Sequence, residues 1–197
     1  MSNQQKPPKK IVIFASGNGT NAENIIKHFQ KSEKAEVVAL FSNRRSAGAL
    51  KKAHDLNVKA LHFDKEAIYH SHEVLNVLRD MKPDLIVLAG FLWLMPKRIL
   101  QQFSNKVINI HPALLPAYGG KGMYGSRVHE AVIANKEKES GISIHYVNDQ
   151  YDEGRIIFQA RTQLDNTDTP DSLAQKIHEL EYRHFPEVIE ELLEKQA

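Results

Sequence analysis

A strand, a tight turn and a helix can be read in that order from residues 11–29, IVIFASGNGTNAENIIKHF. The first four residues are apolar and mostly β-branched, which predicts a buried strand. The segment SGNG that follows at 16–19 predicts a tight turn, because glycine suits the backbone conformations of such turns. The apolar residues at 22, 25, 26 and 29 then have the spacing of one face of an amphipathic helix. This order is typical of the first unit of an α/β protein.

Short apolar runs continue to alternate with helical patterns over the rest of the chain. Strands that are apolar throughout predict a single doubly wound, mostly parallel sheet with helices on both faces, a Rossmann-like α/β fold. Residues 142–146 and 155–164 instead alternate apolar with polar, which predicts two half-exposed strands joined by a turn at 149–154. We expect one domain over residues 10–197 behind a flexible tail, 1–9. The other strands are expected at 37–41, 60–63, 85–89 and 107–110, and the helices around 50–53, over 74–81, from 96 and from 169.

Composition excludes several classes of protein. The chain has 26 lysines and arginines against 24 aspartates and glutamates, a net charge of +2, which gives no support for nucleic-acid or membrane-surface binding. It has no cysteine, which excludes disulfides, thiolate nucleophiles and cysteine-ligated metals. The longest apolar run, residues 85–95, is about half of the roughly 20 residues that a membrane span needs, and the polar start has no signal-peptide core. We therefore expect a cytoplasmic protein that needs no metal, and a homodimer is left open.

The glycine-rich turn is the first candidate for a ligand site, since ligands of open α/β sheets bind at the carboxyl ends of the strands. Backbone N–H groups at the start of the following helix favour a phosphate, and we expect the missing Cβ of Gly19 to let the backbone approach it closely. Gly17, Gly19 and Ala22 also match the G-x-G-x-x-A dinucleotide pattern, and Arg44 and Arg45 could hold a 2′-phosphate. An NADP-dependent reductase and an ordinary tight turn therefore both stay open.

Two polar side chains at the end of the fifth predicted strand are the second candidate. Asn109 and His111 are two residues apart, so a strand points both to the same face. The imidazole can carry a proton near neutral pH and the amide can donate a hydrogen bond to a developing oxyanion, although a hydrogen-bonded core pair would look the same. A carboxylate would have to orient the imidazole, and Asp149 and Asp152 are both candidates.

Glu181 is the third candidate. It continues the apolar stripe of Leu173 and Ile177 along the last predicted helix at intervals of four residues. A carboxylate on a buried face needs a partner or a cationic ligand, but the pattern alone favours the solvated flank of that stripe. No H-E-x-x-H motif accompanies these residues, so no metal site is predicted.

Together these motifs resemble the phosphoribosylglycinamide formyltransferase family over nearly the whole chain. The resemblance rests on SGNGTN at 16–21, FSN at 41–43, LAGF at 88–91, NIHPALLP at 109–116 and D-x-x-D-x-G at 149–154. It implies a formyltransferase-like fold and transfer of the formyl group of the cosubstrate 10-formyltetrahydrofolate to the amine of glycinamide ribonucleotide, a step of de novo purine (IMP) biosynthesis. The substrates would be small molecules. Methionyl-tRNA formyltransferase, formyltetrahydrofolate deformylase and a non-catalytic nucleotide-binding module are the alternatives.

The resemblance also implies roles for individual residues. The catalytic set would be Asn109, His111 and Asp152, and the ribonucleotide would be bound by Gly19, Thr20 and Asn21 at its phosphate and by Glu181 at its amine. The folate would be bound by Leu92, Trp93, Leu94, Met95, Asn109, Asn148, Asp149, Gln150, Tyr151 and Asp152.

The sequence departs from the family pattern in three places. Trp93 stands where the family usually carries an arginine, and Lys65 is the nearest match to a second folate-contacting arginine. The loop at 119–125 is longer than usual and contains four glycines, which predicts a mobile lid.

Overall fold

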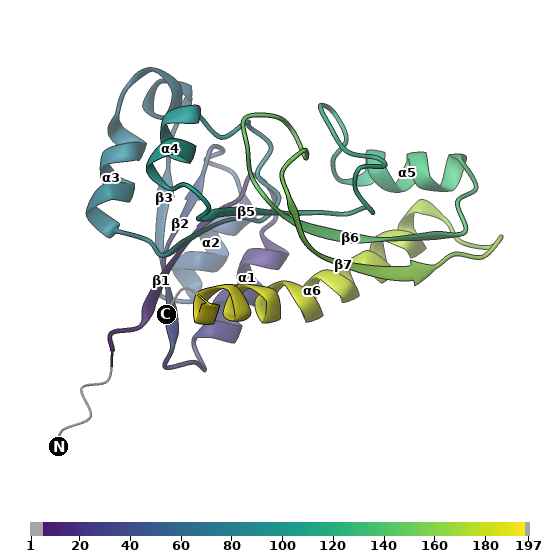
Figure 1. Ribbon diagram of the computed structural model, residues 1–197, viewed down its shortest axis with the longest axis horizontal. Coiled ribbons are helices and arrows are strands. Elements are labelled where there is room, and N and C mark those ends of the chain that lie inside the picture. The colour runs from purple at the N-terminus through teal and green to yellow at the C-terminus, as the bar shows by residue number, and fades with distance from the viewer. Residues whose placement is uncertain (1–5, 196–197) are drawn as a thin grey trace.

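The computed structural model describes residues 6–195, which form a seven-stranded sheet with helices on both faces (Figure 1). The strand order is β3-β2-β1-β4-β5-β6-β7, parallel from β3 to β5 and antiparallel from β5 to β7, so the predicted mostly parallel, doubly wound fold is confirmed. The strands are β1 (Lys9–Phe14), β2 (Ala35–Ser42), β3 (Lys59–His62), β4 (Leu85–Leu88), β5 (Val107–His111), β6 (Glu139–Tyr146) and β7 (Ile156–Gln163). The helices are α1 (Thr20–Phe29), α2 (Gly48–Asp55), a π-helical turn (Glu66–His70), α3 (Glu73–Met81), α4 (Lys97–Gln102), α5 (Ser126–Ala134) and α6 (Pro170–Lys195).

The predicted tail, residues 1–9, is tested only in part. Residues 1–5 lie outside the described residues, and β1 already begins at Lys9, where the backbone N–H of Lys9 donates to the carbonyl of Lys34. The sheet therefore starts one residue before the predicted domain boundary.

Two hydrophobic cores lie on opposite faces of the sheet, because successive side chains of a strand alternate between its faces. Ile11 and Ile13 of β1 pack into the core shared with α1, α2, α5 and α6. Val12 and Phe14 pack into the other core, with α3 and α4. Strand β1 lies between β2 and β4, so the strand order reverses at β1. Such a reversal opens a crevice at the carboxyl ends of β1 and β4.

The long helix α6 packs across α1 and α5 and brings one acidic residue into the core (Figure 1). Glu181 lies on the buried stripe with Leu173 and Ile177 and is only 6% exposed, so its assignment to the solvated flank is wrong. The pattern of a single helix does not show that another element, here α1 with Asn21, packs against this position. No helix in residues 6–195 is long and apolar enough to cross a membrane.

Strand β6 is more deeply buried than its alternating sequence predicts. Ser143 and His145 are both buried although they occupy the expected polar face. The segment after β5 covers Ser143, whose hydroxyl accepts from the backbone N–H of Leu115 at 2.9 Å and donates to the carbonyl of Ala113 at 2.7 Å. The prediction of a half-exposed strand is therefore wrong for β6, because loops from elsewhere in the chain cover its polar side.

The turn before α1 depends on Gly19 for packing. Gly19 has a φ of 75°, and a Cβ there would lie 2.5 Å from the Cα and Cβ of Ala49 on α2. The missing Cβ therefore gives space to the neighbouring helix, and the approach of a phosphate to Gly19 stays a prediction.

Replacing Gly19 by alanine is expected to lower the free energy of unfolding by about 2–4 kcal/mol, the combined cost of a left-handed backbone and of overpacking. Chemical denaturation measures the change. Gly17→Ala is the matched control, since nothing lies within 4 Å of a Cβ at Gly17, and its effect should stay within about 0.5 kcal/mol. Equal stability of the two variants would contradict the packing role of Gly19.

Candidate active site

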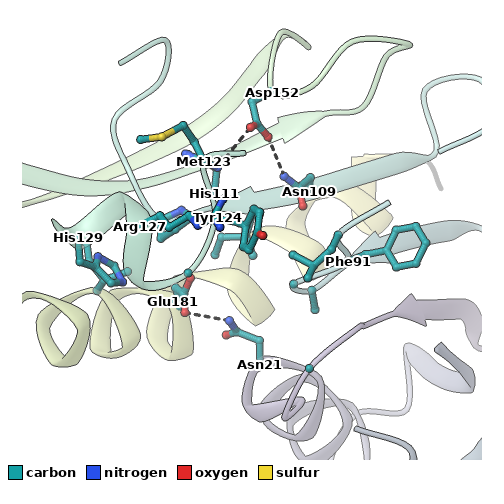
Figure 2. A pocket seen from close by; sticks show the side chains of 18 of the residues that line it. Asn21, Phe91, Asn109, His111, Met123, Tyr124, Arg127, His129, Asp152 and Glu181 are labelled. Carbon is teal, nitrogen blue, oxygen red and sulfur yellow. Dashed lines mark hydrogen bonds and ion pairs between the residues drawn. The ribbon is translucent and has the colours of Figure 1, made fainter. Parts of the chain in front are cut away.

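The three candidate sites predicted from the sequence meet at one cavity of about 620 Å³, at the carboxyl ends of β1, β4 and β5 (Figure 2). Its wall brings together the glycine-rich turn, the end of β4, the Asn109–His111 pair, the loop before α5 and one face of α6. The lining includes Gly17, Asn18, Gly19, Thr20, Asn21, Ala89, Gly90, Phe91, Leu92, Asn109, Ile110, His111, Pro112, Tyr151, Asp152, Ile177, His178 and Glu181.

Asp152 is the carboxylate that faces the predicted catalytic pair. Its Oδ2 lies 3.5 Å from Nδ1 of His111, and its Oδ1 accepts a long hydrogen bond of 3.4 Å from Nδ2 of Asn109. The backbone N–H of Gly120 donates to Oδ2 at 3.0 Å. Asp149 instead pairs with Lys97 at 2.8 Å on the surface. The geometry therefore selects Asp152 from the two aspartates that the sequence left open.

His111 is almost completely buried, at 3% exposed. Its Nε2–H donates to the backbone carbonyl of Tyr118 at 2.7 Å, which leaves Nδ1 facing Asp152. Burial lowers the pKa of His111 below its ordinary value, while the charge of Asp152 and the Tyr118 carbonyl act in the opposite direction. Asp152 therefore favours the protonated ring, as expected, but burial outweighs it.

Asp152 itself remains a charged group. Burial alone would raise the pKa of its carboxyl, but the contacts with His145, His111 and the N–H of Gly120 hold that pKa below its usual value. The carboxylate is thus available as a fixed negative charge beside the imidazole at neutral pH.

Glu181 and Asn21 form a second polar group on another side of the cavity (Figure 2). Nδ2 of Asn21 donates to Oε2 of Glu181 at 2.9 Å, and burial raises the pKa of Glu181 to about 7. Oδ1 of Asn21 and Nδ1 of His129, which also lines the cavity, have no hydrogen-bond partner within the described residues. Buried polar atoms are normally paired, so this side of the cavity is suited to a polar ligand.

The predicted folate residues lie in different surroundings. Of this set, Leu92, Asn109, Tyr151 and Asp152 line the cavity; Met95 is buried in the core beside α3 and α4. The remaining members, outside the lining, are Trp93, Leu94, Asn148, Asp149 and Gln150.

Trp93 and Lys65, two of the three departures from the family pattern, lie close together in the structure. The ammonium of Lys65 lies 5.7 Å from the centre of the Trp93 ring, and Tyr69 packs on the same ring. The hydroxyl of Tyr69 donates to the carbonyl of Leu94 at 2.7 Å. Trp93 therefore packs with Tyr69 and Lys65, and its chain neighbour Leu92 lines the cavity.

The glycine-rich loop and Tyr118, the residue before it, contact both catalytic candidates. The carbonyl of Tyr118 accepts from His111, and the N–H of Gly120 donates to Asp152. Residues 120–125 form part of the cavity wall. The loop that is predicted to act as a lid therefore borders the cavity next to Asp152, and its mobility stays a prediction.

Four further residues of this region were not predicted from the sequence. His129 and Arg127 on α5 and His178 on α6 line the cavity, and His145 on β6 lies behind Asn109. The only sequence signal for His145 is its position on the polar face of an alternating strand, which Ser143 shares. These four residues can be recognised as neighbours only in the folded structure, because they lie on different helices and strands.

The features that favoured a reductase do not come together. Arg44 and Arg45 are not part of the cavity wall, and Arg45 lines a separate cavity of about 300 Å³ near β3. Within residues 6–195 no group of three or more histidine, aspartate or glutamate side chains is arranged to hold a metal ion.

Comparison with known proteins gives one consistent family. The formyl transferase family model matches residues 9–189. A chloroplastic phosphoribosylglycinamide formyltransferase of Arabidopsis thaliana is 36% identical over 98% of this chain and 68% of its own length. The Bacillus subtilis phosphoribosylglycinamide formyltransferase is 33% identical over 94% of this chain and 95% of its own length.

Solved structures agree with these sequence relatives. The crystal structure of glycinamide ribonucleotide transformylase 1 from Symbiobacterium toebii superimposes with a TM-score of 0.87 at 29% identity, and covers 98% of this chain and 94% of that chain. The resemblance seen in the motifs is confirmed over nearly the full length, together with its fold. The chain belongs to the formyl transferase family.

Proposed function

We propose that the protein transfers the formyl group of 10-formyltetrahydrofolate to the amine of glycinamide ribonucleotide, a step of purine biosynthesis. The names of its sequence relatives and structural neighbours support this activity, and none of those reported above is a reductase or a deformylase. The observation that carries the proposal is the convergence of Asn109, His111 and Asp152 in the cavity that Glu181 enters from α6.

Each part of the catalytic group has a place in the reaction. The neutral amine nitrogen attacks the formyl carbon, so that a C–N bond forms and the carbonyl electrons move to oxygen. Asn109 and the protonated ring of His111 stabilise this oxyanion, and the Asp152 carboxylate favours the protonated ring against the effect of burial. The bond to the folate nitrogen then breaks and the C=O bond re-forms. The folate nitrogen gains a proton and the attacking nitrogen loses one.

The ribonucleotide is assigned to the side of the cavity between α1 and α6. Gly19 precedes α1, and Thr20 and Asn21 are the first two residues of that helix. The first backbone N–H groups of a helix attract a phosphate. Glu181 lies beside Asn21 and supplies the acceptor for the substrate amine. The folate is assigned to the opposite side, against Leu92 and the turn that holds Asp152.

Purified protein should form deformylated folate only when both 10-formyltetrahydrofolate and glycinamide ribonucleotide are present. The absorbance of the deformylated folate measures the reaction. His111→Ala protein purified in the same way is the control for contaminating enzymes and should lose most of the rate. Formate release without the ribonucleotide would contradict the proposal in favour of a deformylase. NADPH binding without any folate reaction would contradict it in favour of a reductase.

We also propose that residues 10–197 act as one formyltransferase domain on small molecules in the cytoplasm. The family match over residues 9–189 supports the domain range. The homodimer and the lack of nucleic-acid or membrane partners stay predictions.

A further inference from the structure

Tyr118 connects the imidazole of His111 to the end of α5. Its backbone carbonyl accepts from Nε2–H of His111 at 2.7 Å. A carbonyl oxygen only accepts hydrogen bonds, so this contact keeps a proton on Nε2 whether the ring is neutral or charged. Nδ1, which faces Asp152, is then the nitrogen that gains or loses a proton. The position of one carbonyl oxygen therefore decides which nitrogen of the imidazole titrates.

The two residues after Tyr118 bring the same segment against Asp152. A Cβ at Gly119 would lie 2.6 Å from Cδ2 of Leu115 and 3.3 Å from Cβ of Asp152, so the backbone passes close to this side chain. The N–H of Gly120 donates to Oδ2 of Asp152 at 3.0 Å. Residues 118–120 thus contact both the imidazole and the carboxylate through their backbone, and a shift of this segment would disturb both.

The side chain of Tyr118 holds the segment in place. The backbone alone does not favour this placement, because φ is 58° at Tyr118, an uncommon value for a residue with a Cβ. The hydroxyl donates to Oε1 of Glu137 at 2.6 Å and accepts from Nδ2 of Asn135 at 2.9 Å. Asn135 directly follows α5, whose Val128 and Val132 are buried in the core. The phenol therefore connects residues 118–120 to a helix that is fixed on the sheet.

We propose that Tyr118 is a positioning residue for formyl transfer, whose hydroxyl, held by Asn135 and Glu137, fixes the carbonyl that orients His111. The inference rests on the proposed function, because it assigns His111 to that reaction. Tyr118, Asn135 and Glu137 are not part of the cavity wall. They are therefore expected to act through the imidazole and not through a contact with substrate.

Tyr118→Phe removes the hydroxyl and keeps the aromatic ring and the backbone carbonyl. It should lower kcat by about 5- to 20-fold, because a displaced catalytic group slows the reaction less than the loss of that group. The KM of each substrate should stay within about threefold, since no substrate contact is removed. Tyr146→Phe, at the end of β6 with Arg155 over its ring, is the matched control and should leave kcat unchanged.

The pH profile separates positioning from a general structural loss. The Tyr118 carbonyl raises the pKa of His111 against the effect of burial. Loosening this carbonyl should lower that pKa, so the protonated ring is lost at a lower pH and the basic limb of the kcat profile moves to lower pH. The variant keeps the titratable groups that face His111, which are Asp152, His145 and His129. A lower kcat with an unmoved basic limb would overturn the proposal.

Variants of Glu137 test the same hydrogen bond from its other end. Glu137→Ala should reproduce both effects of Tyr118→Phe, and combining the two should change kcat by no more than about threefold beyond either one. Glu137→Gln loses the charge but keeps an oxygen that can accept from the phenol, so it should retain most of kcat. Multiplicative losses would contradict the proposal, and so would equal losses in Glu137→Ala and Glu137→Gln.

Nitrogen NMR of histidine-labelled protein tests the orientation of His111 without turnover. At a pH where the ring is neutral, the unaltered protein should carry the ring proton on Nε2, and the pKa of the ring should be lower in Tyr118→Phe. The reverse tautomer, or the same pKa in both proteins, would overturn the inference. The tautomer is read in the unaltered protein, so this result stands even where a variant fails to fold. An unaltered protein without formyl transfer would instead disprove the proposed function, so the two failures are distinguishable.

Discussion

Replacing Asp152 by asparagine is expected to lower kcat by on the order of 10²-fold or more, the cost of losing a positioned acid–base or oxyanion contact. Asparagine keeps the shape of the side chain and can still accept from the N–H of Gly120. It also tolerates the left-handed backbone at this position, where φ is 58°. The substitution therefore removes the negative charge beside His111 and little else.

The same substitution should change how the rate depends on pH. Burial already lowers the pKa of His111, and Asp152 opposes that effect, so its removal should lower the pKa further. The protonated ring is then lost at a lower pH, and the basic limb of the kcat profile should move to lower pH. NMR titration of the His111 ring in both proteins measures this step directly.

The two residues are expected to act as one unit. His111→Ala should be about as damaging as Asp152→Asn, and the double variant should be far less damaging than the product of the two losses. Asp165→Asn, which removes an exposed charge from another turn, is the control. An identical His111 pKa in the unaltered and Asp152→Asn proteins would show that Asp152 is only a turn residue.

Glu181→Gln is expected to make the protein more stable at neutral and alkaline pH while weakening ribonucleotide use. The folded protein raises the pKa of Glu181 from the ordinary 4.5 to about 7, because the carboxyl is buried. Between these two pH values the unfolded chain has lost a proton that the folded chain still holds. Unfolding therefore becomes easier as the pH rises.

The size of this effect follows from the pKa shift. At about 1.4 kcal/mol per pKa unit, the unaltered protein loses about 3 kcal/mol of stability from this group between pH 4.5 and 7. Glutamine carries no charge to bury and can still accept from Asn21, so the variant should avoid the loss. Denaturation at pH 4 and pH 8 should show similar stability at the lower pH and a gain of about 3 kcal/mol at the higher.

The functional cost should fall on one substrate. Loss of a charge-assisted contact to the amine should raise the KM of glycinamide ribonucleotide at least about tenfold and leave folate binding nearly unchanged. Glu179→Gln, exposed two residues away on α6, is the matched control for both measurements. Equal losses of both ligands, or no stability gain at pH 8, would contradict the role given to the buried carboxylate.

Local patterns were sufficient to predict most of the fold. A run such as Ile11–Phe14 is apolar on both faces of a strand, and this requires helices above and below the sheet whatever the rest of the chain does. The placement of Asn109 and His111 on one face follows in the same way from the period of a strand. The helix α5 was not predicted: its buried face includes His129 beside Val128 and Val132, and a glycine-rich loop precedes it.

The chemistry of the site depends on contacts between residues that are distant in the chain. Asn21 and Glu181 are separated by 160 positions, and His145 is 36 positions from the Asn109 amide that it contacts. No periodicity connects such residues, so sequence patterns placed Glu181 on the wrong face and overlooked His145.

The local order of apolar and polar residues thus specified the α/β sheet, its helices and the strand ends where a ligand binds, because these depend on the period of each element. The choice of Asp152 over Asp149, the burial of Glu181 and the contact of Asn109 with His145 required the packed molecule. Each is set by desolvation and by hydrogen bonds from another element, and those forces exist only once the elements lie against one another.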